Sequence, residues 1–358
     1  MIETSERIEV AGVAVSPDHF IGGERVASER RFEVISPIDG ERIAEVARAG
    51  EAEVDRAVRA ARDAFPEWAA LGPAGRAEYL HRLAELIEEN NDRLAEVECR
   101  DMAMLLRSLR ARVIRRGARN FRSYADLAAA YEERDWRSLG TWNRVQRMPA
   151  GPAAVITPWN APFMLATWKV APALAAGCTV VLKPAEWSPL SASLLADLTV
   201  EAGFPPGVFN VVQGIGEEAG AALVSHPLLR RVSFTGSPET GRLIGTAAAR
   251  NIVPFTAELG GKGPLIIFED ADLDAAVAQA ANQYDDSGQV CLAGTRLLVQ
   301  ESIAGEFRER LDAAIDEHVL GDPRDERTTI SPLIHPDHLA RVEGFVERAR
   351  QAGDRILR

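Results

Sequence analysis

The chain has 358 residues, 46% of them hydrophobic and 26% charged, and a formal net charge of −12 at pH 7. Its length suits two or three domains with a substantial core, and no apolar run reaches the roughly 18 residues that suggest a membrane span. The negative charge opposes nonspecific nucleic-acid binding. Residues 1–6 lack the basic and apolar regions of a secretory signal. We therefore expect a globular protein without nucleic-acid or membrane partners.

The cysteines and lysines are few. Cys99, Cys178 and Cys291 have no metal-ligand spacing, so we expect no metal and a reducing compartment, with the cytoplasm as the default. Of 41 basic residues only Lys169, Lys183 and Lys262 are lysines, and all three fall in segments discussed below. A chain that otherwise uses arginine can keep lysine where a compact ammonium is required, although chance clustering is the simpler explanation.

The first part of the chain reads as helical. Residues 53–70, 74–98 and 106–131 carry apolar residues at helical spacing between charges. The arginines of residues 107–119 predict a solvated helix face. Residues 136–148 alternate around a Gly140-Thr141 turn and predict a strand or hairpin.

From Gly151 onward, short apolar strands alternate with helices. This alternation predicts right-handed crossovers and a parallel sheet, whose ligands lie beyond the carboxyl ends of the strands. The predicted strands are 152–156, 179–182, 208–212, 231–234 and 253–256, with helices ending near 176 and spanning 191–202, 217–225 and 239–249.

Two of these strands end in phosphate-type segments. Residues 213–220 read G-x-G-x-x-x-G between Gly214 and Gly220, and a tight turn is as good an explanation as a phosphate cradle. Ser237 precedes Pro238 at the start of a helix. Its hydroxyl either caps that helix or helps to bind a pyrophosphate at the helix N-terminus, and the two functions are compatible.

Four further side chains follow predicted strands. Lys183 and Glu186, three residues apart, suit the hydroxyls of a ribose, although a surface ion pair is an equal alternative. Asn160 lies in a proline-stiffened turn and is a candidate oxyanion donor. Glu258, before two glycines, is either a movable base or a turn residue.

Cys291 follows Gly288-Gln-Val. A lone cysteine is more often a small buried apolar residue than a nucleophile. The signal becomes specific only when all these segments are taken together in their order and spacing. They resemble the successive signatures of the aldehyde dehydrogenase superfamily: Thr157-Pro-Trp-Asn160, Lys183-Pro-Ala-Glu186, Phe234-Thr-Gly-Ser237, Glu258-Leu-Gly-Gly-Lys262 and Gly288-Gln-Val-Cys291.

The resemblance implies a covalent mechanism. Cys291 would attack an aldehyde, and Asn160 and the Cys291 backbone N–H would hold the oxyanion of the thiohemiacetal. After hydride transfer, Glu258 would activate the water that hydrolyses the thioester. The chemistry is consistent, because a thiolate is the reactive form and a carboxylate can serve as its base.

The resemblance also implies NAD as the cofactor. Lys183 and Glu186 would bind the adenosine ribose, Ser237 the pyrophosphate and Gly216 the adenine side. The Glu186 carboxylate repels a 2′-phosphate, so NAD is favoured over NADP. Further cofactor contacts are expected from Ile156, Thr157, Trp159, Gly220, Gly236 and Leu259.

The fold implied is α/β, with a Rossmann-like parallel-sheet cofactor domain and an α/β catalytic domain. We expect the NAD-binding domain at residues 1–130 and 150–260, oligomerisation strands at 131–149 and the catalytic domain at 261–358. The resemblance indicates that this catalytic domain is incomplete, and that the complete protein is a homodimer or homotetramer.

Several features depart from the family pattern. Tyr284 and Asp286 replace a Phe and an Asn, and the charge of Asp286 would disfavour a thiolate at Cys291 and slow its attack. The surroundings of Trp168 and of Cys291 resemble catabolic hydroxymuconic-semialdehyde dehydrogenases. A catalytically silent binding module and a CoA-acylating semialdehyde dehydrogenase remain the alternatives, although Glu258 favours hydrolysis.

Overall fold

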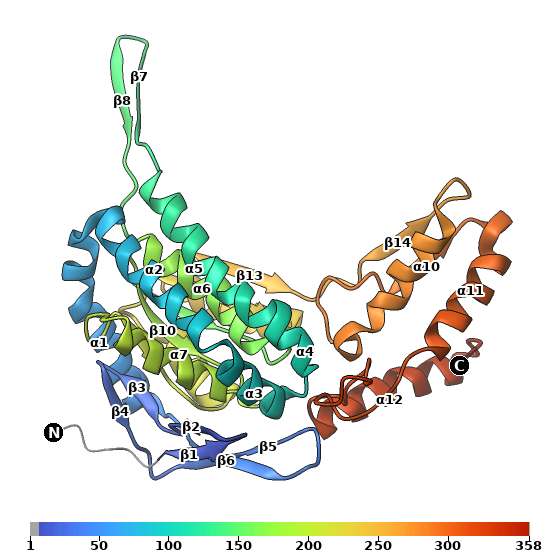
Figure 1. Cartoon of the computed structure of the whole chain (residues 1–358). Helices are drawn as coiled ribbons and strands as arrows, with labels where there is room; N and C mark the ends of the chain where they lie inside the picture. The colour runs from blue at the N-terminus through green and yellow to red at the C-terminus, as the bar shows by residue number, and fades with distance from the viewer. Residues whose placement is uncertain (1–6, 358) are drawn as a thin grey trace.

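The computed structural model describes residues 7–357, except for the side chain of Asp285. Figure 1 shows a large body that ends with β13 (Phe255–Leu259), a hairpin that projects from it, and a smaller body formed by the residues that follow. Residues 1–6, for which the sequence predicts no secretory signal, lie outside the described part. Within residues 7–357 no helix is long and apolar enough to cross a membrane.

A seven-stranded sheet forms the centre of the large body, with the order β13-β12-β9-β10-β11-β3-β4. The strands from β13 to β11 are parallel, and β3 and β4 add an antiparallel edge. β9 and β10 are unbroken buried runs, as expected of central strands covered on both faces. The predicted parallel sheet is confirmed. Besides β13, its strands are β3 (His19–Ile21), β4 (Glu24–Val26), β9 (Pro152–Ile156), β10 (Thr179–Lys183), β11 (Phe209–Val211) and β12 (Arg231–Gly236).

Alternate residues of the central strands enter two separate apolar clusters. Val155 and Leu182 belong to one cluster, whereas Ala154, Ile156 and Val181 belong to the other, as the period of two in a strand requires. The first cluster packs under α2 (Gly72–Glu89), α3 (Asn91–Met102), α5 (Ile114–Ala129), α6 (Pro162–Ala175) and α7 (Leu190–Glu201), and the second under α1 (Glu51–Ala70), α8 (Ala221–Ser225) and α9 (Pro238–Arg250).

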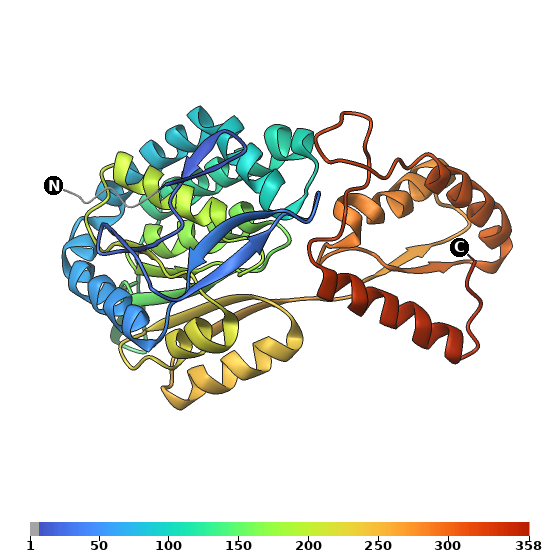
Figure 2. The ribbon, with the colours of Figure 1, turned by 90° about the horizontal axis from the view of Figure 1, so that it is seen from below.

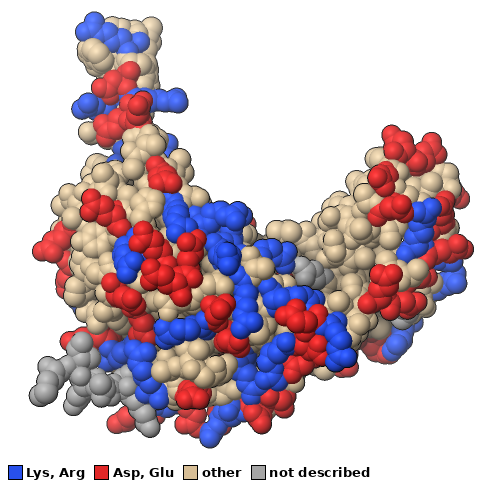
Figure 3. Space-filling view, viewed as in Figure 1, with Lys and Arg blue, Asp and Glu red and all other residues tan. Residues whose placement is uncertain are grey.

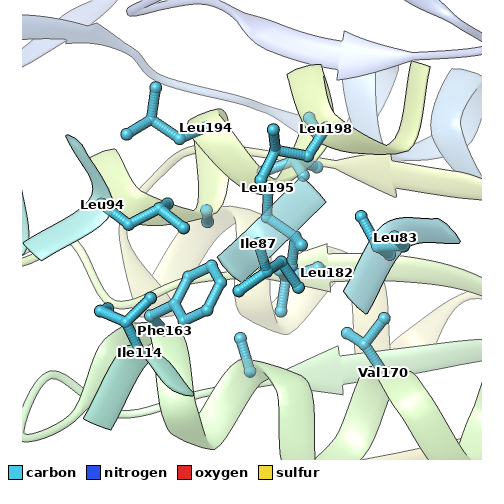
Figure 4. Packing of buried hydrophobic residues seen from close by; sticks show 14 of the residues in the cluster. Leu83, Ile87, Leu94, Ile114, Phe163, Val170, Leu182, Leu194, Leu195 and Leu198 are labelled. Atoms are coloured by element: carbon cyan, nitrogen blue, oxygen red, sulfur yellow. The ribbon is translucent and has the colours of Figure 1, made fainter. Parts of the chain in front are cut away.

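The first cluster is tightly packed between sheet and helices. Figure 4 shows Leu182 of β10 among side chains from α2 and α7, including Ile87 and Leu195. α5 and α6 approach so closely that a Cβ on Gly117 would lie 2.6 Å from the Phe163 ring. A side chain at Gly117 would therefore push the two helices apart.

One predicted helix is two helices. The expected helix over residues 74–98 ends at Glu89, and α3 begins at Asn91 and continues to Met102. Asn90 leaves the helical conformation (φ −101°, ψ 16°), and its side chain donates to the Leu86 carbonyl oxygen. An asparagine that bonds locally to backbone competes with helix continuation, and a separate helix, α3, begins at the next residue.

The predicted helix over residues 106–131 is confirmed in outline. It comprises α4 (Leu106–Ser108), a π-helical turn (Leu109–Val113) and α5. Arginines on its outer side are solvated, as predicted. In Figure 3 basic and acidic side chains are interspersed over this region, and ion pairs such as Arg122–Glu88 join α5 to its neighbours.

The hairpin at the top of Figure 1 consists of β7 (Arg134–Ser138) and β8 (Thr141–Val145). Leu139 and Gly140, both with positive φ, form its two-residue turn, as the twist of a hairpin favours. The turn lies one residue before the predicted position. Trp142, Leu139 and Met148 are exposed along this segment.

The smaller body has its own parallel strand pair and a modest core. β14 (Pro264–Ile267) pairs with β15 (Arg296–Val299), and α10 (Leu273–Ala281) and α11 (Ala304–Asp316) cover them. α12 (Pro336–Gln351) begins beside the large body and runs away from it, as Figures 1 and 2 show. Short 3-10 turns occupy Asn282–Gly288 and Glu301–Ile303, and two small antiparallel pairs lie near the N-terminus: β1 (Ile8–Val10) with β2 (Val13–Val15), and β5 (Arg31–Ile35) with β6 (Arg42–Ala47).

Candidate active site

The strands that carry the predicted site residues end at one edge of the sheet. Ile156, the last residue of β9, is in register with Lys183 of β10 and with Phe234 of β12. Gly236 of β12 is in register with Leu259 of β13. The segments that follow these strands therefore meet at one edge, where ligands of parallel sheets bind.

Asn160 reaches from this edge to the segment of the predicted nucleophile. It is half-buried in the loop between β9 and α6, and its Nδ2 donates to the Gln289 carbonyl oxygen at 2.7 Å. Gln289 is itself held, because its Oε1 accepts from the Ile334 N–H at 3.1 Å. The Asn160 amide therefore contacts Gln289, which lies two residues before Cys291 in the sequence.

The β13–β14 linker passes beside Cys291. A Cβ on Gly261 would lie 3.7 Å from the Cys291 carbonyl oxygen, and Glu258 lies three residues before Gly261. Cys291 and Glu258 are both exposed, so solvent and small molecules can reach them. Among the described residues no hydrogen bond joins the two side chains.

Lys169 also lies at this edge, although the sequence analysis assigned it no catalytic or binding function. It extends from α6, is 8% exposed, and its Nζ donates to the Ser233 Oγ at 3.2 Å. Burial lowers the pKa of Lys169 to about 8, and the nearby Glu258 carboxylate opposes that shift. A buried ammonium therefore lies within the electrostatic reach of Glu258. The sequence feature that could have identified Lys169 as a site residue is the scarcity of lysine in the chain.

Lys183 and Glu186 form the ion pair that their spacing suggested. Lys183 is 2% exposed at the end of β10, and its Nζ lies 3.1 Å from Glu186 Oε2 and 2.9 Å from the Pro184 carbonyl oxygen. Burial lowers the pKa of Lys183, and Glu186 opposes the shift. Gly220 lies alongside, where a Cβ would be 3.6 Å from Lys183 Cδ. Because Lys183 is buried, this is not the surface ion pair of the alternative interpretation.

The glycine-rich segment after β11 combines a tight turn with an open surface. Gly214 adopts φ +146°, and a Cβ there would lie 2.9 Å from Ala219 Cβ, so a side chain is excluded at this position. Gly216 begins a π-helical turn, and a Cβ there would have open space around it. The backbone at Gly216 is therefore accessible to a ligand.

Ser237 caps α9, as one of its two interpretations required. Its Oγ accepts from the Thr240 N–H at 3.0 Å, and Pro238 occupies the first position of the helix. A Cβ on Gly236 would clash with the Phe234 ring, so no side chain fits at this position before the cap. Leu259 lies over the first turn of α9, 2.9 Å from where a Cβ on Gly241 would lie.

Two tryptophans of this edge contact histidine rings from the smaller body. The Trp187 and His335 rings are parallel, with centroids 4.4 Å apart, and the Trp159 and His338 centroids lie 4.8 Å apart. Both histidines belong to the start of α12, and burial lowers the pKa of His338. This contact was not predicted, because neither histidine lies in a recognised motif. Thr157, beside Trp159, is buried.

Tyr284 and Asp286 lie on the 3-10 turn before Cys291. The Tyr284 ring contacts the His318 ring with centroids 6.0 Å apart. Asp286 adopts φ +49°, and its carbonyl oxygen accepts from both the backbone N–H and the Nε2 of Gln289, each at 3.1 Å. The backbone of Asp286 thus helps to fix the segment that carries Cys291.

The carboxyl edge of the parallel sheet thus carries a thiol, a carboxylate and an amide held by a hydrogen bond. These features define an α/β protein with the groups of an enzyme active site. The chain belongs to the aldehyde dehydrogenase family, whose model matches residues 25–358. The expected family is confirmed over nearly the whole chain.

Individual relatives agree. The chain is 42% identical over 350 residues to 2-hydroxymuconic semialdehyde dehydrogenase of Pseudomonas sp. (strain CF600), a match that covers 95% of this chain and 72% of that protein. It is 40% identical to 5-carboxymethyl-2-hydroxymuconate semialdehyde dehydrogenase of Escherichia coli, with the same coverage. The structure of betaine aldehyde dehydrogenase from Staphylococcus aureus in complex with NAD+ has a TM-score of 0.93 at 36% identity and covers 96% of this chain and 70% of that one. The resemblance to semialdehyde dehydrogenases is confirmed.

Proposed function

We propose that this protein oxidises a catabolic semialdehyde to a carboxylate with NAD, through a thioester on Cys291. The observation that carries the proposal is the hydrogen bond from Asn160 Nδ2 to the Gln289 carbonyl oxygen at 2.7 Å. It holds an amide donor against the segment that carries the exposed Cys291 thiol, and stabilisation of an oxyanion requires such a fixed donor. The similarity to two semialdehyde dehydrogenases supports the substrate class.

The residues at the sheet edge fit NAD. Glu186 is partly exposed and is held by buried Lys183, so its carboxylate can accept hydrogen bonds from ribose hydroxyls. The N-terminus of α9 beyond Ser237 is suited to a pyrophosphate, and the open backbone at Gly216 to the adenine side. Ile156, Thr157, Trp159, Gly220, Gly236 and Leu259 border the same edge. When bound, NAD accepts the hydride.

The protein's own residues would act in two stages. The Cys291 thiolate adds to the aldehyde carbon, while the Asn160 amide and the Cys291 N–H bind the oxyanion. Loss of a hydride from that carbon leaves a thioester on Cys291. Glu258 then takes a proton from water, whose oxygen attacks the thioester, and the carboxylate leaves as the Cys291 thiol is regenerated. The buried Lys169 ammonium lies within the electrostatic reach of Glu258 during that proton transfer.

The parts of the molecule would divide this work. We assign NAD binding to residues 1–130 and 150–260, substrate chemistry to 261–358, and assembly into a homodimer or homotetramer to 131–149, whose hairpin exposes Trp136 and Trp142. The cytoplasm is the compartment proposed.

The test is NADH production with NAD and a panel of semialdehydes and simple aldehydes. We expect turnover with a muconic-type semialdehyde and none in Cys291→Ala, because no other group forms the thiohemiacetal. Activity that requires added CoA would instead identify an acylating enzyme. Absence of NADH with every aldehyde, from protein that binds NAD, would contradict the proposal.

A further inference from the structure

Helices α6 and α7 begin without capping side chains of their own. Their N-cap residues are Ala161 and Pro189, and neither provides a side-chain acceptor. A helix start leaves backbone N–H groups unpaired, and burial makes that costly. Another part of the molecule must therefore supply the acceptors.

Two carboxyl groups of α3 supply them. Glu98 Oε2 accepts from the Phe163 N–H at 3.0 Å, and Asp101 Oδ2 accepts from the Leu190 N–H at 2.8 Å. Both side chains are 0% exposed, and α3 lies against α7 (Figure 1). Three residues apart, they face the same side of α3. One helix thus caps two others.

Each capped helix follows a loop of the candidate active site. Phe163 comes three residues after Asn160, and Leu190 comes four residues after Glu186. The two loops are also joined to one another, since Ser188 Oγ donates to the Trp159 carbonyl oxygen at 3.3 Å. The caps therefore anchor the far ends of both loops on α3.

Burial makes these two carboxyl groups costly for the fold. It raises the pKa of Glu98 to about 7 and the pKa of Asp101 well above its ordinary value, and the charge of Glu98 adds to the shift of Asp101. Well-packed apolar side chains in their place would avoid the desolvation cost but would leave the two loop ends without acceptors. Stability alone does not account for the pair.

We propose that Glu98 and Asp101 are positioning residues for the reaction: Glu98 sets the place of Asn160, and Asp101 sets the place of Glu186. The proposal rests on the proposed function, because it assigns oxyanion binding to Asn160 and ribose binding to Glu186. It predicts that the two residues have separable effects, although they are neighbours on one helix.

The variants Glu98→Met and Asp101→Leu remove the acceptors and keep approximate volume. Hydrogen exchange, followed by mass spectrometry, should rise at least about 10-fold in residues 157–165 of Glu98→Met and in 184–192 of Asp101→Leu, because the opening free energy of each loop end falls by one hydrogen bond. Glu98→Gln and Asp101→Asn keep an acceptor oxygen and should restore slow exchange. Glu96→Met, which removes a partly buried carboxylate of α3 that pairs with Arg110 and caps no helix, is the matched control.

The two variants should also differ in which kinetic parameter they change. Glu98→Met should lower kcat by about 10- to 100-fold with little change in the KM for NAD, since misplacing a catalytic group by about 1 Å costs that much. Asp101→Leu should raise the KM and Kd for NAD by about 10-fold, the equivalent of about 1.4 kcal/mol, with a smaller effect on kcat.

A purely structural pair would lower thermal stability and impair both parameters together, and the amide variants would not restore them. That outcome overturns the proposal, as does unchanged exchange in both loops. Should Glu98→Met fail to fold, Glu98→Asp withdraws the carboxyl group from Phe163 while keeping its charge, and wild-type exchange and kcat in that variant would also overturn it. If the wild-type chain makes no NADH, the proposed function fails, but the exchange rates still decide whether the caps hold the loops.

Discussion

Glu258 is exposed to water at the edge of the sheet and lies within the electrostatic reach of the buried Lys169 ammonium. Glu258→Gln should leave formation of the thioester largely intact and slow its hydrolysis, because water activation lacks a substitute base. A rapid burst of NADH followed by slow turnover in a stopped-flow experiment is the expected result.

Lys169→Met is the companion variant. It should slow hydrolysis by less than Glu258→Gln does, since it removes a supporting charge and leaves the base in place. Normal steady-state turnover by Glu258→Gln would show that another group activates water.

Glu186 is the residue that should decide between NAD and NADP. Its carboxylate is fixed by Lys183 at 3.1 Å, so a 2′-phosphate would meet a negative charge that cannot move away. We expect kcat/KM for NAD to exceed that for NADP by at least about 10-fold, or about 1.4 kcal/mol. Glu186→Ser should narrow the ratio, mainly through better use of NADP, and equal use by the wild type would refute the assignment.

At the scale of elements, β3 pairs with β11, and the imidazole of His19 in β3 must remain neutral. His19 is fully buried, and its Nδ1 accepts from the Gln213 N–H at 3.0 Å, which a protonated Nδ1 cannot do. Burial lowers the pKa of His19 to about 4 from its ordinary value of 6.5. Between these two values the unfolded chain binds a proton that the folded chain excludes.

Stability should therefore fall as the pH falls from about 6.5 to about 4, and His19 should account for about 3 kcal/mol of that loss. Urea unfolding at several pH values would measure it. His19→Asn keeps an acceptor near the Nδ1 position and does not titrate, so its stability should depend less on pH across this range. Parallel pH profiles for the two proteins would exclude His19 as the cause.

The elements that sequence predicted best are those with one dominant signal. The apolar runs of β9 and β10 and the amphipathic α5 lie where expected. The small strands β1 to β6 were not predicted, since pairs of three to six residues depend on tertiary partners more than on their own pattern. β13 runs to Leu259, three residues past its predicted end, because pairing with β12 continues through Leu259.

The residues of the candidate site were likewise predicted only in part. Motifs named Asn160, Lys183 and Glu186 correctly as residues of one edge, because strand ends converge by topology. The ring contacts of His335 with Trp187 and of His338 with Trp159 join segments about 150 residues or more apart, and no local sequence pattern predicts such contacts. Glu98 and Asp101 read as ordinary charges of an amphipathic helix until their burial is known.

At the scale of the whole molecule, the two bodies differ in how much core each contains. The smaller body packs around a short cluster that includes Ile267, Phe307 and Leu311, while Ile266 and Phe268 remain more than half exposed. Less apolar burial means less stabilisation. Residues 264–316 should therefore open at lower denaturant concentration than β9 to β12.

Native-state hydrogen exchange at increasing urea would measure this order. Peptides of β14, α10 and α11 should lose protection first, with peptides of the central sheet protected until global unfolding. A single concerted loss of protection in both bodies would show that α12 and its histidine contacts couple them into one cooperative unit.

The choice of arginine over lysine has a chemical consequence for a protein that handles aldehydes. Aldehydes condense with primary amines to form imines, whereas the guanidinium of arginine is always protonated and does not form them. Lys169 and Lys183 are buried, and Lys262 is the exposed lysine. Incubation with a reactive aldehyde should thus concentrate side-chain adducts on Lys262, beside the loop of Cys291, and leave most of the charged surface chemically unchanged.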